Sequence, residues 1–172
     1  MEEEIKIPDE RIGVLIGPSG SVKKKLMKKT STIITIDSGS GDILIEGEGE
    51  NFVKACDTVK AIGRGFNPEK AFKLLEENFL LKIINIPEFT GKNTSAQIAK
   101  KGRIIGKQGL AKKRIEEETN SFISVYGKTV SIISHISDIK RAEEAVELLL
   151  KGATHETMEN RLKNFGKTRF EL

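Results

Sequence analysis

Hydrophobic positions in the first third of the chain follow two different periods. Val22 and Leu26 lie four residues apart, which places them on one face of an amphipathic helix. Over 32–37 and 42–46, apolar or β-branched residues alternate with polar ones, as in strands that bury one face. A helical period returns over 51–62. With a short apolar strand and a short helix before these segments, the pattern predicts the order β-α-α-β-β-α.

The same order is predicted a second time, because the sequence repeats itself. The runs 17–20 (GPSG) and 106–109 (GKQG) lie 89 positions apart, and at that offset Leu26 falls on Ile115. The second set of elements comprises strands at 83–87, 121–126 and 129–133 and a closing helix at 137–150. We therefore predict an α+β fold of two units, each with a three-stranded antiparallel sheet.

Two further helices are predicted outside the repeated units. Asn67 followed by Pro68 is typical of a helix start, and Thr154 can cap a last amphipathic helix. We expect the apolar edge of that last helix to dock between the units. The predicted organisation is a first domain over 1–66, a connecting helix over 67–80, a second domain over 81–151, and a C-terminal helix and tail over 152–172.

Composition narrows the class of protein. The 172 residues include 37% hydrophobic and 31% charged side chains, as in soluble globular proteins. No apolar run approaches the roughly 20 residues of a membrane span. The acidic start, residues 1–4, is unlike a secretory signal, so a cytoplasmic location is expected. The single cysteine, Cys56, forms no internal disulfide, and the two histidines show no metal-ligand spacing, so neither a metal nor a cofactor is predicted.

Enzyme motifs do not fit the sequence. A Walker-type phosphate loop needs four residues between its glycines and a Ser or Thr after the Lys. Gly102 and Gly106 enclose only three residues, and Gln108 follows Lys107. No nucleophile elbow is present either. We expect no enzymatic activity.

The Gly-x-x-Gly turns are suited to the backbone of a nucleic acid. Glycine lacks a β-carbon, so sugar and phosphate can approach the main chain, and the start of the following helix attracts the anion. Residues 100–114 hold seven basic side chains and no acidic one, within a net charge of +4. The cations at 112–114 oppose the dipole of their own helix start, which favours a bound anion there.

Residues 102–119, which include Ile104-Ile105-Gly106-Lys107-Gln108-Gly109, resemble the KH domain, a module that binds single-stranded RNA or DNA. The element order resembles the eukaryotic type (type I), and the first copy matches through 14–20. Both units, taken with 62–68 and 126–130, are similar to a family of two-KH proteins of archaea and eukaryotes that assists assembly of the small ribosomal subunit.

That resemblance implies binding of (pre-)rRNA near the 3′ end of the small-subunit rRNA. The partners it implies are the nuclease that matures this end and the alpha subunit of translation initiation factor two. We expect a monomer without membrane contact. The candidate RNA-binding residues of the second unit are Arg103, Ile104, Ile105, Gly106, Lys107, Gln108, Gly109, Leu110, Lys112, Lys113, Arg114 and Ile123.

These candidates have different expected roles. The two glycines allow close approach of the strand, and Lys107 and Gln108 contact phosphate or sugar. The remaining cations supply electrostatic support, and the apolar residues form the wall of the base groove. The weaker candidates, in the first unit, are Gly17, Pro18, Ser19, Gly20, Lys23 and Lys24. They are weaker because Pro18 has no backbone N–H and Ser19 has no charge.

Less specific interpretations stay open. Each turn is also compatible with an ordinary connection between two helices. The cations at 112–114 each have a Glu four residues later, so a solvated face with weak ion pairs is an alternative. The protein as a whole is also compatible with a protein-interaction scaffold built from degenerate KH domains, or with a general single-stranded nucleic-acid-binding regulator.

Overall fold

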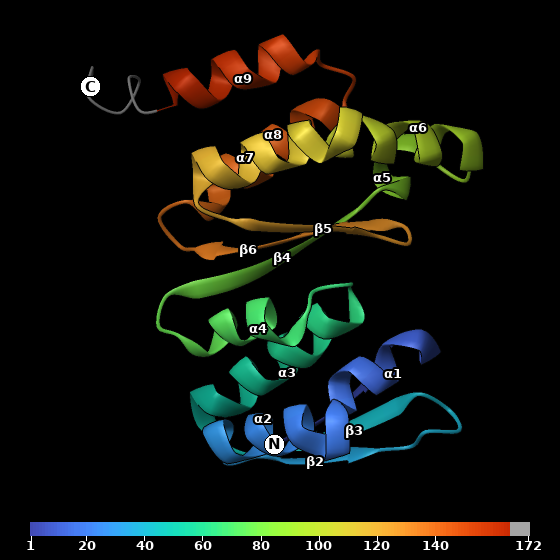
Figure 1. Cartoon of the computed structure of the whole chain (residues 1–172), viewed down its shortest axis with the longest axis vertical. Helices are drawn as coiled ribbons and strands as arrows, with labels where there is room; N and C mark the ends of the chain where they lie inside the picture. The colour runs from blue at the N-terminus through green and yellow to red at the C-terminus, as the bar shows by residue number, and fades with distance from the viewer. Residues whose placement is uncertain (166–172) are drawn as a thin grey trace. The chain divides into compact units, whose positions relative to one another are not determined.

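The computed structural model describes residues 1–165, and the chain divides into two compact units, Met1–Leu81 and the part from Lys82 onward (Figure 1). The first unit contains β1 (Glu2–Lys6), α1 (Asp9–Ile16), η1 (Pro18–Gly20), α2 (Ser21–Thr30), β2 (Ile33–Ile36), β3 (Asp42–Glu46), α3 (Gly49–Gly63), α4 (Pro68–Ala71) and η2 (Phe72–Leu75). The second contains β4 (Phe79–Asn85), inside which the division falls, α5 (Pro87–Thr90), α6 (Thr94–Ile105), η3 (Lys107–Gly109), α7 (Leu110–Thr119), β5 (Phe122–Tyr126), β6 (Thr129–His135), α8 (Ile139–Leu150) and α9 (His155–Asn164).

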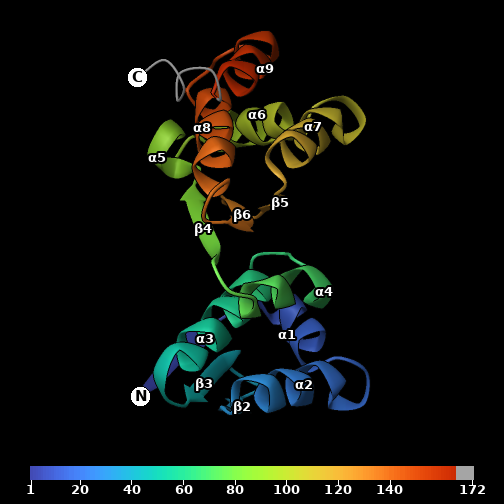
Figure 2. The same ribbon diagram turned by 90° about the vertical axis from the view of Figure 1, so that its left-hand side faces the viewer.

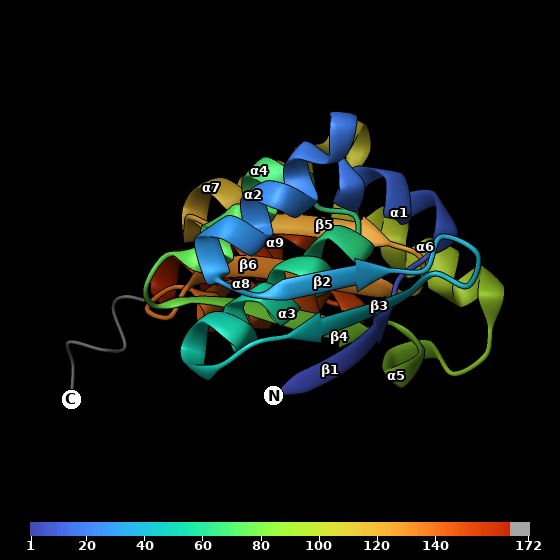
Figure 3. The ribbon, with the colours of Figure 1, turned by 90° about the horizontal axis from the view of Figure 1, so that it is seen from below.

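The first sheet is antiparallel in the order β1-β3-β2, and Figure 3 shows the three strands side by side. Ile5 pairs with Ile43 and Ile34 pairs with Ile45, and all four side chains are buried. Leu44, between two buried isoleucines of β3, is 36% exposed on the opposite face. The alternation in the sequence therefore does separate a face covered by helices from an open one.

The second sheet has the order β4-β6-β5, and helices α6, α7 and α8 lie on one of its faces (Figure 2). Its core takes apolar residues from every layer, including Ile104 of α6, Ile115 of α7 and Val146 of α8, each with no exposed surface. The predicted α+β class, with two three-stranded antiparallel sheets, is confirmed.

The connections α2–β2 and α7–β5, which are equivalent in the two units, are closed by the same pair of hydrogen bonds. Thr30 donates from its hydroxyl to the Leu26 carbonyl at 2.7 Å and shares a second hydrogen bond, also 2.7 Å, with Thr32. Thr119 repeats both contacts in the second unit, with the Ile115 carbonyl and the Ser121 hydroxyl, each at 2.6 Å. The repeat seen in the sequence is therefore also a repeat of buried hydrogen bonds.

The segment after α3 differs from the single connecting helix that we expected. Asn67 does cap its start, accepting from the Lys70 N–H at 2.8 Å, but one α-helical turn passes directly into the 3-10 helix η2 and ends at Leu75. Ala71 and Leu74 are buried, and the segment packs on α3. It belongs to the first unit because its apolar side chains complete that core.

The last helix, α9, packs on the core of the second unit. Met158 and Leu162 of α9 belong to the second core and are 0% and 4% exposed. Arg141 of α8 also donates to the Leu162 carbonyl at 3.1 Å. The predicted tail, 166–172, lies outside the described residues. Within the part that the structure describes, no helix has the length and apolar character needed to cross a membrane.

Candidate nucleic-acid interface

The turn at 106–109 combines three residues with positive φ. Gly106 has φ 72° and ψ 179°, Gln108 has φ 55° and ψ 26°, and Gly109 has φ 75° and ψ 9°. The Gly109 N–H donates to the Gly106 carbonyl at 3.2 Å, so the chain reverses tightly between α6 and α7. The turn is therefore held by its own backbone, with Lys107 and Gln108 at its exposed tip.

The two glycines of this turn differ in the space around the position of a β-carbon. A β-carbon on Gly106 would lie 2.5 Å from the Ala111 β-carbon and 2.9 Å from the Ala111 nitrogen, so the first glycine lets α7 pack against the end of α6. A β-carbon on Gly109 would have no neighbour within 4 Å. We expected both glycines to admit a ligand, and the structure leaves open space only at Gly109.

The first unit repeats this backbone closely. Gly17 has φ 72° and ψ 174°, Ser19 has φ 55° and ψ 28°, and Gly20 has φ 74° and ψ 15°. The Gly20 N–H donates to the Gly17 carbonyl at 3.1 Å. The two turns share one backbone shape but differ in chemistry at the tip: Pro18 brings no N–H where Lys107 brings an N–H and a cation.

The three cations at the start of α7 are each near a carboxylate. Lys112 Nζ lies 3.1 Å from Glu116 Oε1, and Lys113 Nζ lies 3.9 Å from Glu117 Oε1. The ion-pair alternative therefore describes these two lysines. Arg114 instead pairs with Glu159 of α9, with 3.6 Å between Nε and Oε1.

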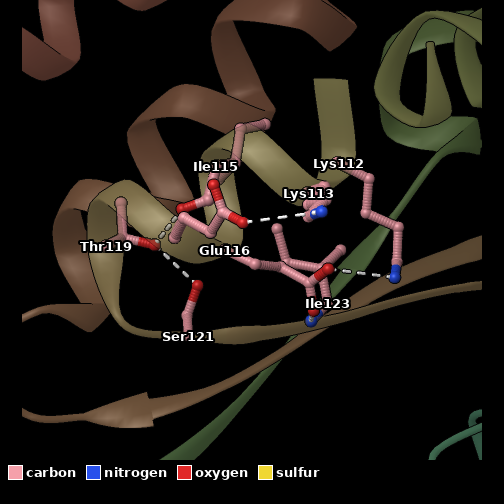
Figure 4. A network of polar contacts seen from close by, with 8 residues as sticks. Lys112, Lys113, Ile115, Glu116, Thr119, Ser121 and Ile123 are labelled. Atoms are coloured by element: carbon pink, nitrogen blue, oxygen red, sulfur yellow. Dashed lines mark hydrogen bonds and ion pairs between the residues drawn. The ribbon is translucent and has the colours of Figure 1, made fainter. Parts of the chain in front are cut away.

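Glu116 connects α7 to β5, and Figure 4 shows it between Lys112 and Ile123. Its second oxygen, Oε2, accepts from the Ile123 backbone N–H at 3.0 Å. The Glu116 side chain is only 18% exposed, so its charge is partly buried beside the Lys112 cation. Sequence reasoning missed this role. The available signal was a difference between the two copies. At the position equivalent to Glu116, the first copy has the uncharged Met27.

Arg103 connects the end of α6 to the loop before α9. Its Nη2 donates to the Ala153 carbonyl at 2.6 Å, and its own carbonyl lies 2.8 Å from His155 Nε2. Arg11 makes comparable contacts in the first unit. It donates to the carbonyls of Ile62 and Phe66, each at 2.8 Å. The guanidinium of Arg103 therefore has a structural role, but its partner is a neutral carbonyl, so its positive charge is still available for the expected electrostatic support.

Family models match twice: residues 80–167 match the eukaryotic type KH domain (KH domain type I), in a model of the second KH domain of PNO1, and residues 2–61 match the KH domain. The chain belongs to the KH domain family. It contains two KH domains, the second of the PNO1 kind.

Three known proteins are similar in sequence to all or part of this chain. A KH domain-containing protein of Methanocaldococcus jannaschii is 40% identical over 99% of this chain and 78% of its own length. The pre-rRNA-processing protein PNO1 of Candida albicans is 34% identical over 58% of this chain and 37% of its own. The Dim2p chain in a crystal structure of an a/eIF2alpha-aDim2p-rRNA complex from Pyrococcus horikoshii is 43% identical, with a TM-score of 0.90, over 98% of this chain and 95% of that one. The resemblance to two-KH proteins of ribosome assembly is confirmed.

The apolar candidates of the second KH domain fall into two classes. Ile104 and Ile123 are 0% and 3% exposed, so they support the surface from the core and offer a ligand almost no area. Ile105 and Leu110, on either side of the turn, are 38% and 58% exposed. Of the four residues expected to form the groove wall, only the two that flank the glycines therefore expose enough side-chain surface to contact a ligand.

A hollow of about 470 Å³ lies between α7 and α9, next to the turn. Lys107 and Leu110 line it near the turn, and His155 and Glu159 line it on α9. Sequence reasoning did not place α9 residues beside the turn. Hydrophobic spacing showed only that α9 has an apolar face and carried no information on which unit would bury it.

Proposed function

We propose that this protein is a non-catalytic factor of small-subunit assembly in the cytoplasm, and that its second KH domain binds single-stranded (pre-)rRNA near the 3′ end. The observation that carries the proposal is the exposed turn at 106–109. Space is open at Gly109, and Lys107 forms no ion pair within residues 1–165. This arrangement suits a sugar-phosphate strand, because bare main chain and a cation lie side by side.

The Pyrococcus horikoshii complex supports both the ligand class and one partner. In that structure the Dim2p relative is assembled with rRNA and with a/eIF2alpha. We propose the alpha subunit of initiation factor two as a partner of this chain as well. The nuclease that matures the rRNA 3′ end is a further proposed partner, for which the support is the resemblance to the two-KH family.

Replacing both tip residues of each turn compares the two KH domains directly. Lys107→Asp with Gln108→Asp removes a cation and introduces two anions, whereas Pro18→Asp with Ser19→Asp introduces two anions into a turn that has no cation. Aspartate tolerates the left-handed backbone of Gln108 and Ser19, so both variants are expected to fold. The measurement is fluorescence anisotropy of a short unstructured RNA, with folding followed by circular dichroism.

We expect the 107/108 variant to lose nearly all binding and the 18/19 variant to lose much less. Equal losses from the two variants would contradict the assignment to the second domain. A wild-type protein that binds the alpha subunit of initiation factor two but no RNA at low salt would support the scaffold alternative instead.

A further inference from the structure

Helices α2 and α7 occupy equivalent places in the two KH domains but carry different charge. Both begin with a run of cations, Lys23 to Lys25 in α2 and Lys112 to Arg114 in α7. In α7, three glutamates follow. In α2, the equivalent positions hold Met27, Lys28 and Lys29, so this helix has five lysines and no acid.

The lysines of α2 also lack the ion pairs of α7. No carboxylate in the described part of the chain lies within ion-pair distance of any of the five. Lys24 donates weakly to the Ser19 carbonyl at 3.4 Å, which places its ammonium beside the first turn. Lys25 Nζ lies 5.1 Å from the centre of the Phe72 ring. Both contacts leave the positive charge uncompensated.

This arrangement has a cost to the isolated protein. Lys23 and Lys24 lie in the first turn, where the helix dipole disfavours cations, whereas Lys28 and Lys29 lie in the last turn, where it favours them. Lys24 with Lys28, and Lys25 with Lys29, are like-charge neighbours one turn apart, each costing roughly 0.2–0.5 kcal/mol. A polyanion bound along the helix would offset these terms.

The lysine face, defined as Lys24, Lys25, Lys28 and Lys29, is on the solvent side of α2. All four residues are exposed, whereas Leu26 and Thr30 on the opposite side are buried. The described residues of α2 include no aromatic side chain on which an unpaired base could stack. The helix itself can therefore contact phosphates but offers no stacking group for a base; the nearest ring, Phe72, lies beside Lys25 and is partly buried.

We propose that the lysine face of α2 binds the phosphate backbone of a base-paired RNA segment. The inference rests on the proposed RNA-binding function and adds a second site with a different ligand. A duplex presents rows of phosphates with its base edges hidden, which matches a cationic helix without stacking groups. The first turn beside it cannot hold a single strand as the second can, because Pro18 has no N–H to donate.

The test gives α2 the charges of α7. Lys28→Glu with Lys29→Glu places acids where α7 has Glu117 and Glu118, one turn after lysines that can pair with them. The variant is expected to fold because α7 forms a helix with the same charges. The reciprocal variant, Glu117→Lys with Glu118→Lys, is the matched control. The probes are a blunt RNA duplex, a short unstructured RNA and polyglutamate, each titrated over a range of salt, with circular dichroism as the control for folding.

For the duplex, we expect the α2 variant to bind about 10- to 100-fold more weakly at about 0.1 M salt, with the log-log salt slope reduced by about 1.8 for two phosphate contacts. For the unstructured strand, we expect a change of less than about twofold, because the second KH domain is intact. The reciprocal variant should bind both the duplex and the unstructured strand at least as tightly as the wild type.

Three results would overturn the inference. They are unchanged duplex binding, equal losses on duplex and strand, and a loss confined to polyglutamate, which would indicate an acidic protein as the ligand. Failure of the wild type to bind the unstructured strand would contradict the proposed function separately, since duplex binding is measured independently of it.

Discussion

Lys112 and Glu116 form an ion pair inside the second KH domain, with 3.1 Å between Nζ and Oε1, and the same carboxylate holds the Ile123 N–H. One side chain thus compensates the first cation of α7 and attaches this helix to β5 (Figure 4). The consequence for binding is that the charge of Lys112 is already compensated by Glu116, which weakens its attraction for a phosphate.

Glu116→Gln should release Lys112. Glutamine keeps an oxygen that can accept from the Ile123 N–H but removes the charge, so the log-log salt slope for a short unstructured RNA should steepen by about 0.7, the value for one more phosphate on a single strand. The free energy of unfolding should fall by about 1 kcal/mol. Glu118→Gln is the control, because Glu118 is exposed and forms no ion pair in the described part of the chain. An identical slope in both variants would show that Lys112 does not reach phosphate.

The two glycines of the second turn should separate stability from binding. Gly106→Ala places a β-carbon against Ala111 at a backbone conformation restricted to glycine, so we expect a loss of about 2 to 4 kcal/mol of unfolding free energy. Gly109→Ala meets no atom and should cost only about 1 to 2 kcal/mol for its left-handed backbone.

RNA affinity should follow the opposite order when both variants are compared well below their melting temperatures. The added methyl at position 109 points into the space assigned to the strand, whereas the one at 106 points at α7. Urea unfolding and anisotropy measure the two quantities. A Gly109→Ala variant with wild-type affinity would exclude close approach of the strand there.

The ion pair between Glu3 and Lys60 predicts a pH dependence of stability in the first KH domain. Glu3 Oε1 lies 2.7 Å from Lys60 Nζ, and this hydrogen bond lowers the pKa of Glu3 and raises the pKa of Lys60. Stabilisation from the lowered carboxyl pKa is present above its unfolded value, near 4.5, and is lost as pH falls through the folded value. Stabilisation from the raised lysine pKa is lost as pH rises above about 10.

Wild type and Glu3→Gln should therefore differ most between about pH 5 and pH 10 and converge at both extremes. The difference should stay below about 1 kcal/mol, because both side chains are more than a third exposed. Urea unfolding at several pH values measures it. Glu4→Gln on the same strand is a control without a described ion pair, and a pH-independent difference would contradict the assigned cause.

Contacts made by α7, and by α6 with the loop before α9, show what the sequence alone could not predict. Spacing of Val22 with Leu26 and of Ala111 with Ile115 was enough to predict both helices, and the two glycine pairs located both turns. The same spacing did not reveal that Glu116 would reach the Ile123 N–H. It also did not reveal that Arg103 would be held by the Ala153 carbonyl. These contacts join residues 7 and 50 positions apart, and their partners are backbone atoms, which every residue carries.

By itself the sequence determined the repeat, the order of elements and the residues at each turn, because periodicity and glycine chemistry act locally along the chain. Only the tertiary structure decided which of those residues are available to a ligand. It buried Ile104 and Ile123, paired Lys112 and Lys113 with glutamates, and left Lys107 and the lysine face of α2 without ion-pair partners in residues 1–165. The physical reason is that burial and charge compensation depend on neighbours in space.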